Sequence, residues 1–579
     1  MNIKVKKTVS VLSASLMTLM MMGSFSIASA AQRTSAASST GTFTFYTIDD
    51  MVGFDPAIFS WDARQDELGI FEGLVHFGPN FKVVPAIATH WTTKGNVWTF
   101  YLRKNARFSN GDPVTAPDFV YSMRRAINPV TAQLVKHQSS YLGDVPIKNA
   151  NRIVVGYPVN SLGVKAINNY TLQITLSQPD PSLLTQLATD MWQLPVDPKV
   201  VSGKNESIWT NPATVVSDGP YMLSSYTPGT DEILVPNPYY YGKVPLKQIH
   251  VLASKSGASE LLPFENNQSD MAILNPQDVP AVNANSTLKN QLQHVQTAVN
   301  YTLQVTPSLN SALQNLKVRQ AFAESINKEA IAKSVLLGTG VPAYDGKVTT
   351  WMAPWIAQDG LQYNPTNAQK LMQEAGYPGG KGFPTVRILT ASPDKVAEAI
   401  QQMWEQTLGV TVDLQEVSWN VYVSQLNQVL PANEVGFTQY GQYSQFPSWK
   451  SLMPTTLAGL PGFTNVPRWS LSGSDATKLE QVITSPMDPS EKNYLESQLI
   501  AKDEPMAVRS VMKIGVKALQ TNNVSLMKQY IIAKNHLAYV LPVYTVNNAI
   551  LLRSNVHGYF PMRMWLVTPP VWLGDISVK

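Results

Sequence analysis

Aromatic side chains interleaved with amides are the residues of this sequence best suited to chemistry with a ligand. They occur in three short segments: Phe59-Ser60-Trp61, Trp419-Asn420-Val421-Tyr422, and residues 439–446. Such residues can line a cleft, because they offer flat apolar walls with hydrogen-bonding edges. The alternative is that each aromatic packs against its own domain, and composition alone favours that alternative.

Motifs for catalysis, phosphate binding and metal binding are absent from the sequence. It contains no G-x-S-x-G, H-E-x-x-H, Walker A or EF-hand pattern, and its seven His residues include no pair with metal-ligand spacing. A carboxylate pair for glycoside hydrolysis stays open, because two such groups need only meet in space. We expect no enzyme, no metal site and no cofactor.

Composition narrows the class of protein further. The 579 residues predict two to four domains at about 150 residues each. Charged residues make up only 15%, against about 25% in an average soluble protein. The absence of Cys excludes a disulfide scaffold, a thiolate metal site and a cysteine nucleophile. Near-neutral charge without a Lys/Arg stripe predicts no nucleic-acid partner.

The N-terminus has the three parts of a secretory signal. Lys4, Lys6 and Lys7 precede an apolar stretch over residues 8–27, and Ala28-Ser29-Ala30 ends it. This pattern predicts a signal peptide over residues 1–30, cleaved after Ala30, and an exported protein. An uncleaved single-span anchor is the alternative. A lipid anchor through Cys is excluded, and residues 31–40 are expected to form a flexible lead of small polar residues.

Hydrophobic periodicity predicts a mixed α/β protein without internal repeats. In the second half, strand and helix patterns alternate, which predicts a mostly parallel sheet there. A helix is also expected to start at Thr115, with Pro117 and Asp118 in its first turn. The expected strands are 42–47, 98–102, 172–176, 233–235, 248–252, 386–389, 410–414 and 541–552, and the expected helices are 64–75, 319–335, 364–375, 394–408 and a helix-rich region over 488–540.

A series of motifs in order along the chain resembles the extracellular solute-binding proteins of ABC importers, in the large oligopeptide/dipeptide class known as family 5. The resemblance spans nearly all of the chain after residue 40. The motifs are residues 53–57 (Gly-Phe-Asp-Pro-Ala), 71–75, 85–88, 98–104, 108–122, 162–167, 218–221 (Asp-Gly-Pro-Tyr), 318–321, 374–378 and 541–544.

The resemblance implies a two-lobed α/β fold like that of periplasmic binding proteins, with a hinge and an additional third domain. Carried onto this chain, lobe I comprises residues 41–82, 208–305 and 545–579. The third domain is 83–207 and lobe II is 306–544. The implied function is capture of a peptide between the lobes and its delivery to permease subunits in the membrane. We expect a monomer at the cell surface or in a periplasm.

The resemblance also implies which residues contact the ligand. The first lobe would supply the segment that begins at Phe59, and lobe II would supply Trp419 and the stretch 439–443. Residues 489–540 look longer than the usual helical stretch of the family. The candidate ligand-binding residues are Phe59, Ser60, Trp61, Asp62, Tyr301, Trp419, Tyr422, Gln439, Tyr440, Gln442 and Tyr443.

One position departs from the family pattern. Oligopeptide binders commonly have Asp-Tyr-x-Asp/Glu-Pro, where the first Asp holds the α-ammonium of the peptide. Here Gln442 precedes Tyr443, and the second acid has also become an amide. An amide loses the charge-assisted part of that hydrogen bond. A terminally blocked or non-peptide ligand therefore stays open, as do a sensory receptor and a hydrolase on the same scaffold. The exchange of acids for amides would also suit a low-pH exterior, where carboxylates lose their charge.

Overall fold

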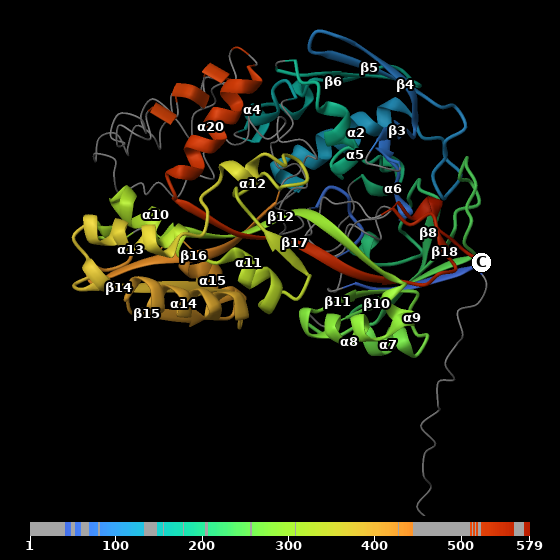
Figure 1. The fold of residues 1–579 in the computed structure, drawn as a ribbon. Helices are drawn as coiled ribbons and strands as arrows, with labels where there is room; N and C mark the ends of the chain where they lie inside the picture. Colours follow the sequence, from blue (N-terminus) through green and yellow to red (C-terminus); the bar gives the residue numbers. More distant parts are fainter. Residues whose placement is uncertain are drawn as a thin grey trace, which may run out of the picture.

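Two long strands, β12 (Leu292–Thr306) and β17 (Val540–Leu552), cross the middle of the computed structural model and connect its two halves (Figure 1). They pair antiparallel with each other and share one sheet with strands from both halves. The described residues are 41–47, 53–58, 69–78, 82–131, 147–154, 156–177, 179–202, 206–254, 257–306, 308–426, 428–443, 510–511, 513–515, 517–518, 521, 523–560 and 572–579.

The sheet that contains these two strands has seven members in the order β11-β17-β12-β16-β14-β15, with β13 also on β17. Only the pairs β14–β15 and β14–β16 are parallel. The expectation of a mostly parallel sheet was therefore wrong, because the two crossing strands enter the sheet antiparallel to their neighbours. The other members are β11 (Met271–Leu274), β13 (Gly340–Pro342), β14 (Thr385–Thr390), β15 (Val412–Glu416) and β16 (Glu434–Tyr443).

Helices cover this sheet in the half formed by the later part of the chain (Figure 1). The helices predicted to start near 364 and 394 are confirmed, with Asn364 and Asp394 as their N-caps. The described helices here are α10 (Leu316–Glu324), α11 (Lys328–Ala330), a π-helical turn (Ile331–Val335), α12 (Ile356–Asp359), α13 (Pro365–Glu374), α14 (Lys395–Leu408), α15 (Trp419–Gln425) and α20 (Val524–His536), with 3-10 turns at Ala312–Gln314 and Pro378–Gly380.

The single helix expected over 319–335 was wrong, because the chain breaks it after Glu324. The Ser325 hydroxyl donates to Phe322 O at 3.0 Å, and the Asn327 side chain accepts from Ala330 N at 2.9 Å. Short polar side chains compete with helical hydrogen bonds in this way. The apolar periodicity continues across the break, and this is why the pattern suggested one helix.

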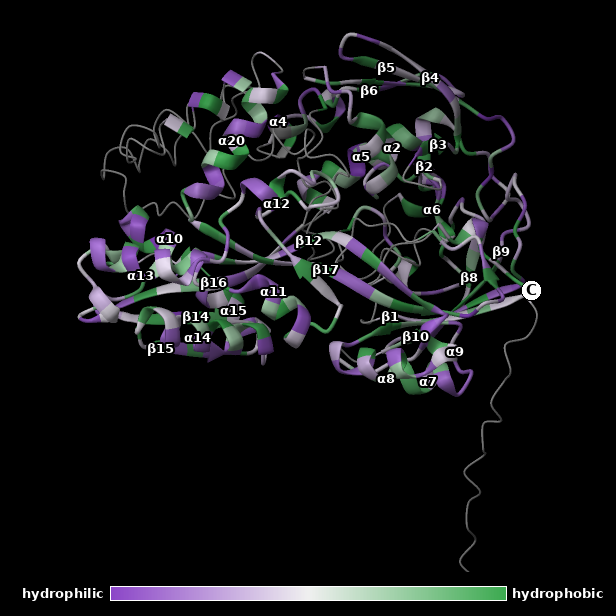
Figure 2. Ribbon diagram, in the orientation of Figure 1, coloured by the Kyte–Doolittle hydropathy of each residue, from purple (hydrophilic) through white to green (hydrophobic). Residues whose placement is uncertain are grey.

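The core of this half is built around Trp404 on α14. Its indole meets Phe322 edge-on at 4.8 Å and Phe437 of β16 at 4.9 Å, and its Nε1 donates to Phe322 O at 3.1 Å. Figure 2 shows hydrophobic and hydrophilic residues alternating around α14. Its buried positions include Val396 and Ile400, at helical spacing with Trp404. This packing fixes the N-terminus of α14 relative to β16.

The half formed by the earlier part of the chain contains two further four-stranded sheets, ordered β1-β10-β9-β8 and β4-β5-β7-β6. The predicted strand at 42–47 is confirmed as β1, parallel to β10. The strands are β1 (Thr42–Thr47), β4 (Ala88–Lys94), β5 (Val97–Leu102), β6 (Val164–Asn168), β7 (Thr171–Thr175), β8 (Tyr221–Thr227), β9 (Asp231–Pro236) and β10 (Gln248–Ala253), with the short pairs β2 (Val75–Phe77) with β3 (Val83–Pro85) and β18 (Val556–His557) with β19 (Ser577–Val578).

Short helices complete this half. The predicted start at Thr115 is confirmed: Thr115 N donates to the Asp118 carboxylate at 2.7 Å, and Pro117 lies in the first turn of α2. The helices are α2 (Ala116–Ile127), α4 (Ala150–Val154), α5 (Leu183–Thr189), α6 (Pro198–Val201), α7 (Leu261–Glu265), α8 (Val279–Ala284) and α9 (Ser286–Lys289), with 3-10 turns at Val159–Ser161, Glu206–Trp209, Pro276–Asp278 and Leu573–Asp575.

The helix expected over 64–75 was wrong at its C-terminal end, where the chain enters β2. Leu74 N donates to the Gln193 side chain at 3.1 Å, and Leu74 O accepts from Ala88 N at 3.0 Å. A Cβ at Gly73 would lie 2.1 Å from Gln193 Nε2, so Gly73 allows the close approach. The bounds of the two lobes and the third domain stay a prediction.

Candidate functional site

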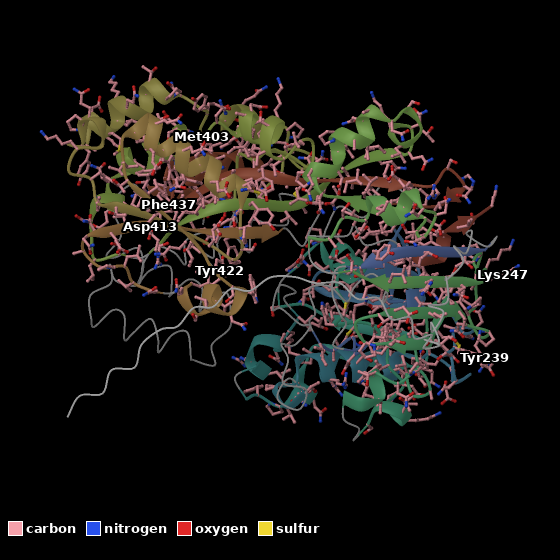
Figure 3. The ribbon with its side chains drawn as sticks, turned by 90° about the horizontal axis from the view of Figure 1, so that it is seen from below. Tyr239, Lys247, Met403, Asp413, Tyr422 and Phe437 are labelled. Carbon is pink, nitrogen blue, oxygen red and sulfur yellow. The ribbon has the colours of Figure 1, made fainter. Side chains whose placement is uncertain are left out.

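The strand order reverses at β14, and the carboxyl end of this strand is therefore the candidate place for a binding site. After β14 the chain passes through α14 to β15 on one side, and then through α15 to β16 on the other side. In open α/β sheets, ligands bind outside the carboxyl ends of the strands at such a reversal. The residues that follow β14 and β15, together with the end of β16, are therefore the candidate site. Figure 3 shows Tyr422 of α15 on the side of its half that is turned toward the other half.

Asp394, the N-cap of α14, lies at the centre of this site. Its Oδ1 accepts from Val396 N at 2.7 Å and from Ala397 N at 3.1 Å. Its Oδ2 accepts from the amide of Gln439, a predicted site residue on β16. The backbone N–H of Asp394 donates to Glu416 Oε1 at 2.8 Å. The loop after β14 is thus tied to the end of β15 and to β16.

Two aromatic residues of α15 border the same place. The Tyr422 hydroxyl donates to the Gln439 carbonyl oxygen, and the Tyr422 ring is buried. Burial raises the pKa of Tyr422, and nearby Tyr440 and Tyr301 raise it further, so the phenol stays protonated. Trp419 stacks on Tyr422 with ring centroids 5.4 Å apart, and 64% of its surface is exposed. Trp419 therefore offers a free aromatic face.

The crossing strands contribute a second aromatic pair. Tyr301 of β12 and Tyr544 of β17 stack with centroids 4.8 Å apart and planes within 11°. Burial raises the pKa of both phenols, and the negative charge of Asp394 raises each of them further. The site thus combines side chains from α14, α15 and β16 with side chains from the strands that join the halves.

One edge of β16, over residues 439–443, is open in the sense that no described strand pairs with it. Along one side β12 pairs with residues 436–443, whereas on the other side β14 pairs only with residues 434–438. Within the described residues, positions 439–443 have no strand on that second side. Backbone groups of alternate residues in an antiparallel pair point away from the partner strand. Apart from the Gln439 carbonyl oxygen, which accepts from Tyr422, this edge therefore has backbone N–H and C=O groups that can pair with another extended chain.

The remaining described candidates lie on the opposite face of the sheet. Gln442 stands across from Asn300 of β12, and its side chain is only 5% exposed. A Cβ at Gly346 would lie 2.8 Å from Gln442 Oε1, so this amide packs against the loop that contains Gly346. Tyr440, which is 42% exposed, shares this face. Phe59, Ser60, Trp61, Asp62 and the side chain of Tyr443 lie outside the described residues.

A buried ion pair holds the loop against which Gln442 packs. Asp345 Oδ2 lies 2.8 Å from Lys534 Nζ of α20, and Asp345 Oδ1 accepts from Val348 N at 2.7 Å. Burial by itself would raise the pKa of Asp345, but Lys534 and the backbone donors more than offset this and lower it. Asp345 O also accepts from Asn300 Nδ2 at 2.8 Å. The position of Gln442 therefore depends on a network that includes β12 and α20.

Gly346→Ala should lower the free energy of unfolding by about 1–3 kcal/mol, because the added methyl group has no room beside Gln442 Oε1 and Val540 Cγ1. Urea denaturation of the purified variant measures the change. The double variant Gly346→Ala/Gln442→Ala should lose less free energy of unfolding than the two single variants added together. The shorter side chain at position 442 leaves room for the added methyl group. Additive costs would show that the two residues do not contact each other.

Asp394 and Tyr544 belong to the candidate site but were not among the residues expected from the sequence. Asp394 begins a predicted helix directly after a predicted strand, and this placement could have identified it. Tyr544 lies within a family motif, but its pairing with Tyr301 is set by the register of β12 and β17. Among the residues with a described placement, no group of three or more His, Cys, Asp or Glu could hold a metal ion. No helix in those same ranges is long and apolar enough to cross a membrane.

Comparisons with known proteins show what the chain is similar to. The model of bacterial extracellular solute-binding proteins, family 5 Middle, matches residues 82–461. Periplasmic oligopeptide-binding protein OppA of Salmonella typhimurium is 30% identical over 373 residues, which cover 62% of this chain and 67% of that protein. Heme-binding protein A of Haemophilus influenzae is 25% identical over 519 residues, covering 85% and 90%.

A solved structure shows the same fold. The substrate-binding domain of an oligopeptide ABC transporter from Bacillus anthracis str. Ames matches with a TM-score of 0.69 at 20% identity, covering 93% of this chain and 99% of that one. This likeness confirms the predicted α/β fold with two lobes and a third domain.

Proposed function

Because the chain belongs to the family 5 bacterial extracellular solute-binding proteins, we propose that it is the substrate-binding receptor of an ABC importer that captures a peptide between its lobes. The open edge of β16 carries this proposal, since an extended peptide can add to such an edge as a further strand. Main-chain hydrogen bonds of this kind suit many peptide sequences. The exposed face of Trp419 would contact ligand side chains beside that edge.

The proposed site requires the backbone of the ligand, and this can be tested directly. Calorimetry should detect binding of a blocked penta-alanine peptide, and N-methylation of its amide nitrogens, one at a time, should reduce affinity at least tenfold at alternate positions. N-methylation removes an N–H group whose hydrogen bond a carbonyl oxygen of the sheet edge would accept. Equal affinity for all the methylated peptides would argue against strand addition.

A terminally blocked or non-peptide ligand is a second candidate, favoured by Gln442. Its amide is buried against the loop around Gly346 and carries no charge for a peptide α-ammonium. The relative named heme-binding protein A shows that one member of this family is named for a non-peptide ligand. Native mass spectrometry of ligands that co-purify with the protein would separate the candidates.

The proposed receptor acts outside the cytoplasm and delivers its ligand to permease subunits, without enzymatic activity of its own. The expected signal over residues 1–30 and the absence of Cys support an exported protein without a lipid anchor. Mass spectrometry of the protein from its producing cell should find Ala31 at the N-terminus. A retained residue 1 would instead support the membrane-anchored alternative.

A further inference from the structure

We propose that Asp394 recognises a positively charged group of the ligand, an ammonium or a guanidinium. The inference rests on the proposed function and names the ligand chemistry that the site selects. Asp394 is half-buried beside the open edge of β16, where its Oδ2 also contacts the Gln439 amide. A ligand bound along residues 439–443 would therefore pass close to this carboxylate.

The carboxylate of Asp394 has capacity for another donor. A carboxylate accepts about four hydrogen bonds, and three are in place, from Val396 N, Ala397 N and Gln439. Across the ranges that the structure describes, no Lys, Arg or His forms an ion pair with Asp394. The neighbouring Lys395 is engaged elsewhere, since its Nζ lies 2.7 Å and 2.9 Å from the two oxygens of Glu398.

The surroundings of Asp394 keep the site negative. The N-terminus of α14 contributes only about half a positive charge. Glu416 brings a second carboxylate to the same loop, through its 2.8 Å contact with Asp394 N. From Val396 to Tyr443 the sequence contains no Lys, Arg or His. The one basic residue of α14, β15, α15 and β16 is Lys395, and its ammonium is paired with Glu398. A ligand carboxylate would therefore find no unpaired positive charge on these elements, whereas a cation would find Asp394.

The aromatic residues fit the same ligand chemistry. Tyr301 and Tyr544 lie close enough to Asp394 for its charge to raise their pKa values, after the larger effect of burial. Carboxylates bind ammonium and guanidinium groups through charge-assisted hydrogen bonds. The exposed Trp419, which stacks on Tyr422, can attract a cation through its ring face. The site therefore favours a cation over a neutral or anionic group.

The test compares peptides that differ only in one charge. The probes are blocked penta-alanine peptides with one Lys at each position in turn, and the same peptides with N-ε-acetyl-lysine. Calorimetry should show at least one Lys peptide binding about tenfold more tightly than its acetylated counterpart. Asp394→Asn should reduce that ratio to below about twofold. Asn is as good an N-cap as Asp, so this variant removes the charge and keeps the cap of α14.

Glu405→Gln is the matched control, because it removes a carboxylate from an exposed position of the same helix outside the site, and the amide oxygen can still accept from Val412 N. This variant should keep the tenfold preference for Lys. A preference that survives in Asp394→Asn, or one that is absent from the unmodified protein, would overturn the inference. If the acetylated peptides bind without any preference for Lys, only this inference fails. If neither set of peptides binds, the proposed peptide function fails with it.

Discussion

Replacing Arg125 with methionine should lower the free energy of unfolding by about 3–5 kcal/mol, because it leaves the Asp55 carboxylate buried without a positive charge. Arg125 Nη1 and Nη2 bind the two Asp55 oxygens at 2.6 Å and 2.5 Å, and Asp55 is 2% exposed. The pair joins the motif at residues 53–57 to α2. Urea denaturation followed by circular dichroism measures the loss.

The double variant Asp55→Asn/Arg125→Met separates the loss of the ion pair from the loss of packing. The introduced asparagine would still accept the hydrogen bond that Asp55 Oδ1 receives from Ala57 N at 3.0 Å. Removing both charges should therefore recover much of the stability lost in Arg125→Met. A double variant that is as unstable as the sum of the two single variants would contradict this account.

Glu260 should make the protein less stable as the pH rises from about 4.5 to about 8. Burial raises the pKa of Glu260 from 4.5 to about 8, against a smaller opposing effect of its 2.8 Å hydrogen bond from Ile273 N. The folded protein holds this proton more tightly than the unfolded chain, so the stabilisation is complete below pH 4.5 and lost as the pH passes 8. At about 1.4 kcal/mol per pH unit, the loss is about 4–5 kcal/mol.

Urea denaturation of the unmodified protein and of Glu260→Gln between pH 4 and pH 9 tests this expectation. The glutamine carbonyl still accepts from Ile273 N, so the variant removes only the titration. Its stability should fall less steeply with pH over this window. Glu265→Gln, at an exposed position of the same helix, is the control and should leave the profile unchanged. Identical profiles for all three proteins would contradict a buried, protonated Glu260.

The direction of this pH effect is relevant to the low-pH exterior that the composition suggested. That habitat stays a prediction. Glu260 favours the folded state at acid pH, whereas the Asp345–Lys534 pair acts in the opposite direction. The lowered pKa of Asp345 means that its stabilisation is present above its ordinary pKa and is lost as the pH falls through the folded value. The pH of greatest stability depends on which group dominates.

Elements with strong local signals were predicted well from the sequence. The caps at Asn364 and Asp394 coincide with clear apolar periodicity, so α13 and α14 were located within about a turn. The break after Glu324 was missed because it depends on hydrogen bonds of Ser325 and Asn327 that do not disturb the apolar pattern. The direction of strand pairing was missed as well, because β12 and β17 are separated by more than 200 residues.

The candidate residues on β16 do not all lie on one face of the sheet, and the geometry of a strand explains why. Two of the candidate residues, Gln439 and Tyr422, contact each other. Gln442 and Tyr440 point to the opposite face from Gln439, because side chains alternate along β16. Residues 439–443, which form one polar and aromatic segment in the sequence, therefore contribute side chains to both faces of the sheet. The helix cap Asp394 could be recognised as part of the site only once the neighbouring strand order was known.

The place of β17 in the joining sheet has a consequence for biosynthesis. This strand lies between β11 and β12, pairing Leu552 with Met271 and Leu551 with Leu292, yet it is near the C-terminus of the 579-residue chain. During synthesis, β11 and one edge of β12 have no partner among the described strands until β17 is made, more than 200 residues after β12. The other edge of β12 pairs earlier in the sequence, with β16. The nascent protein therefore carries two unpaired strand edges until β17 emerges, and these edges are the places where it can pair with another chain.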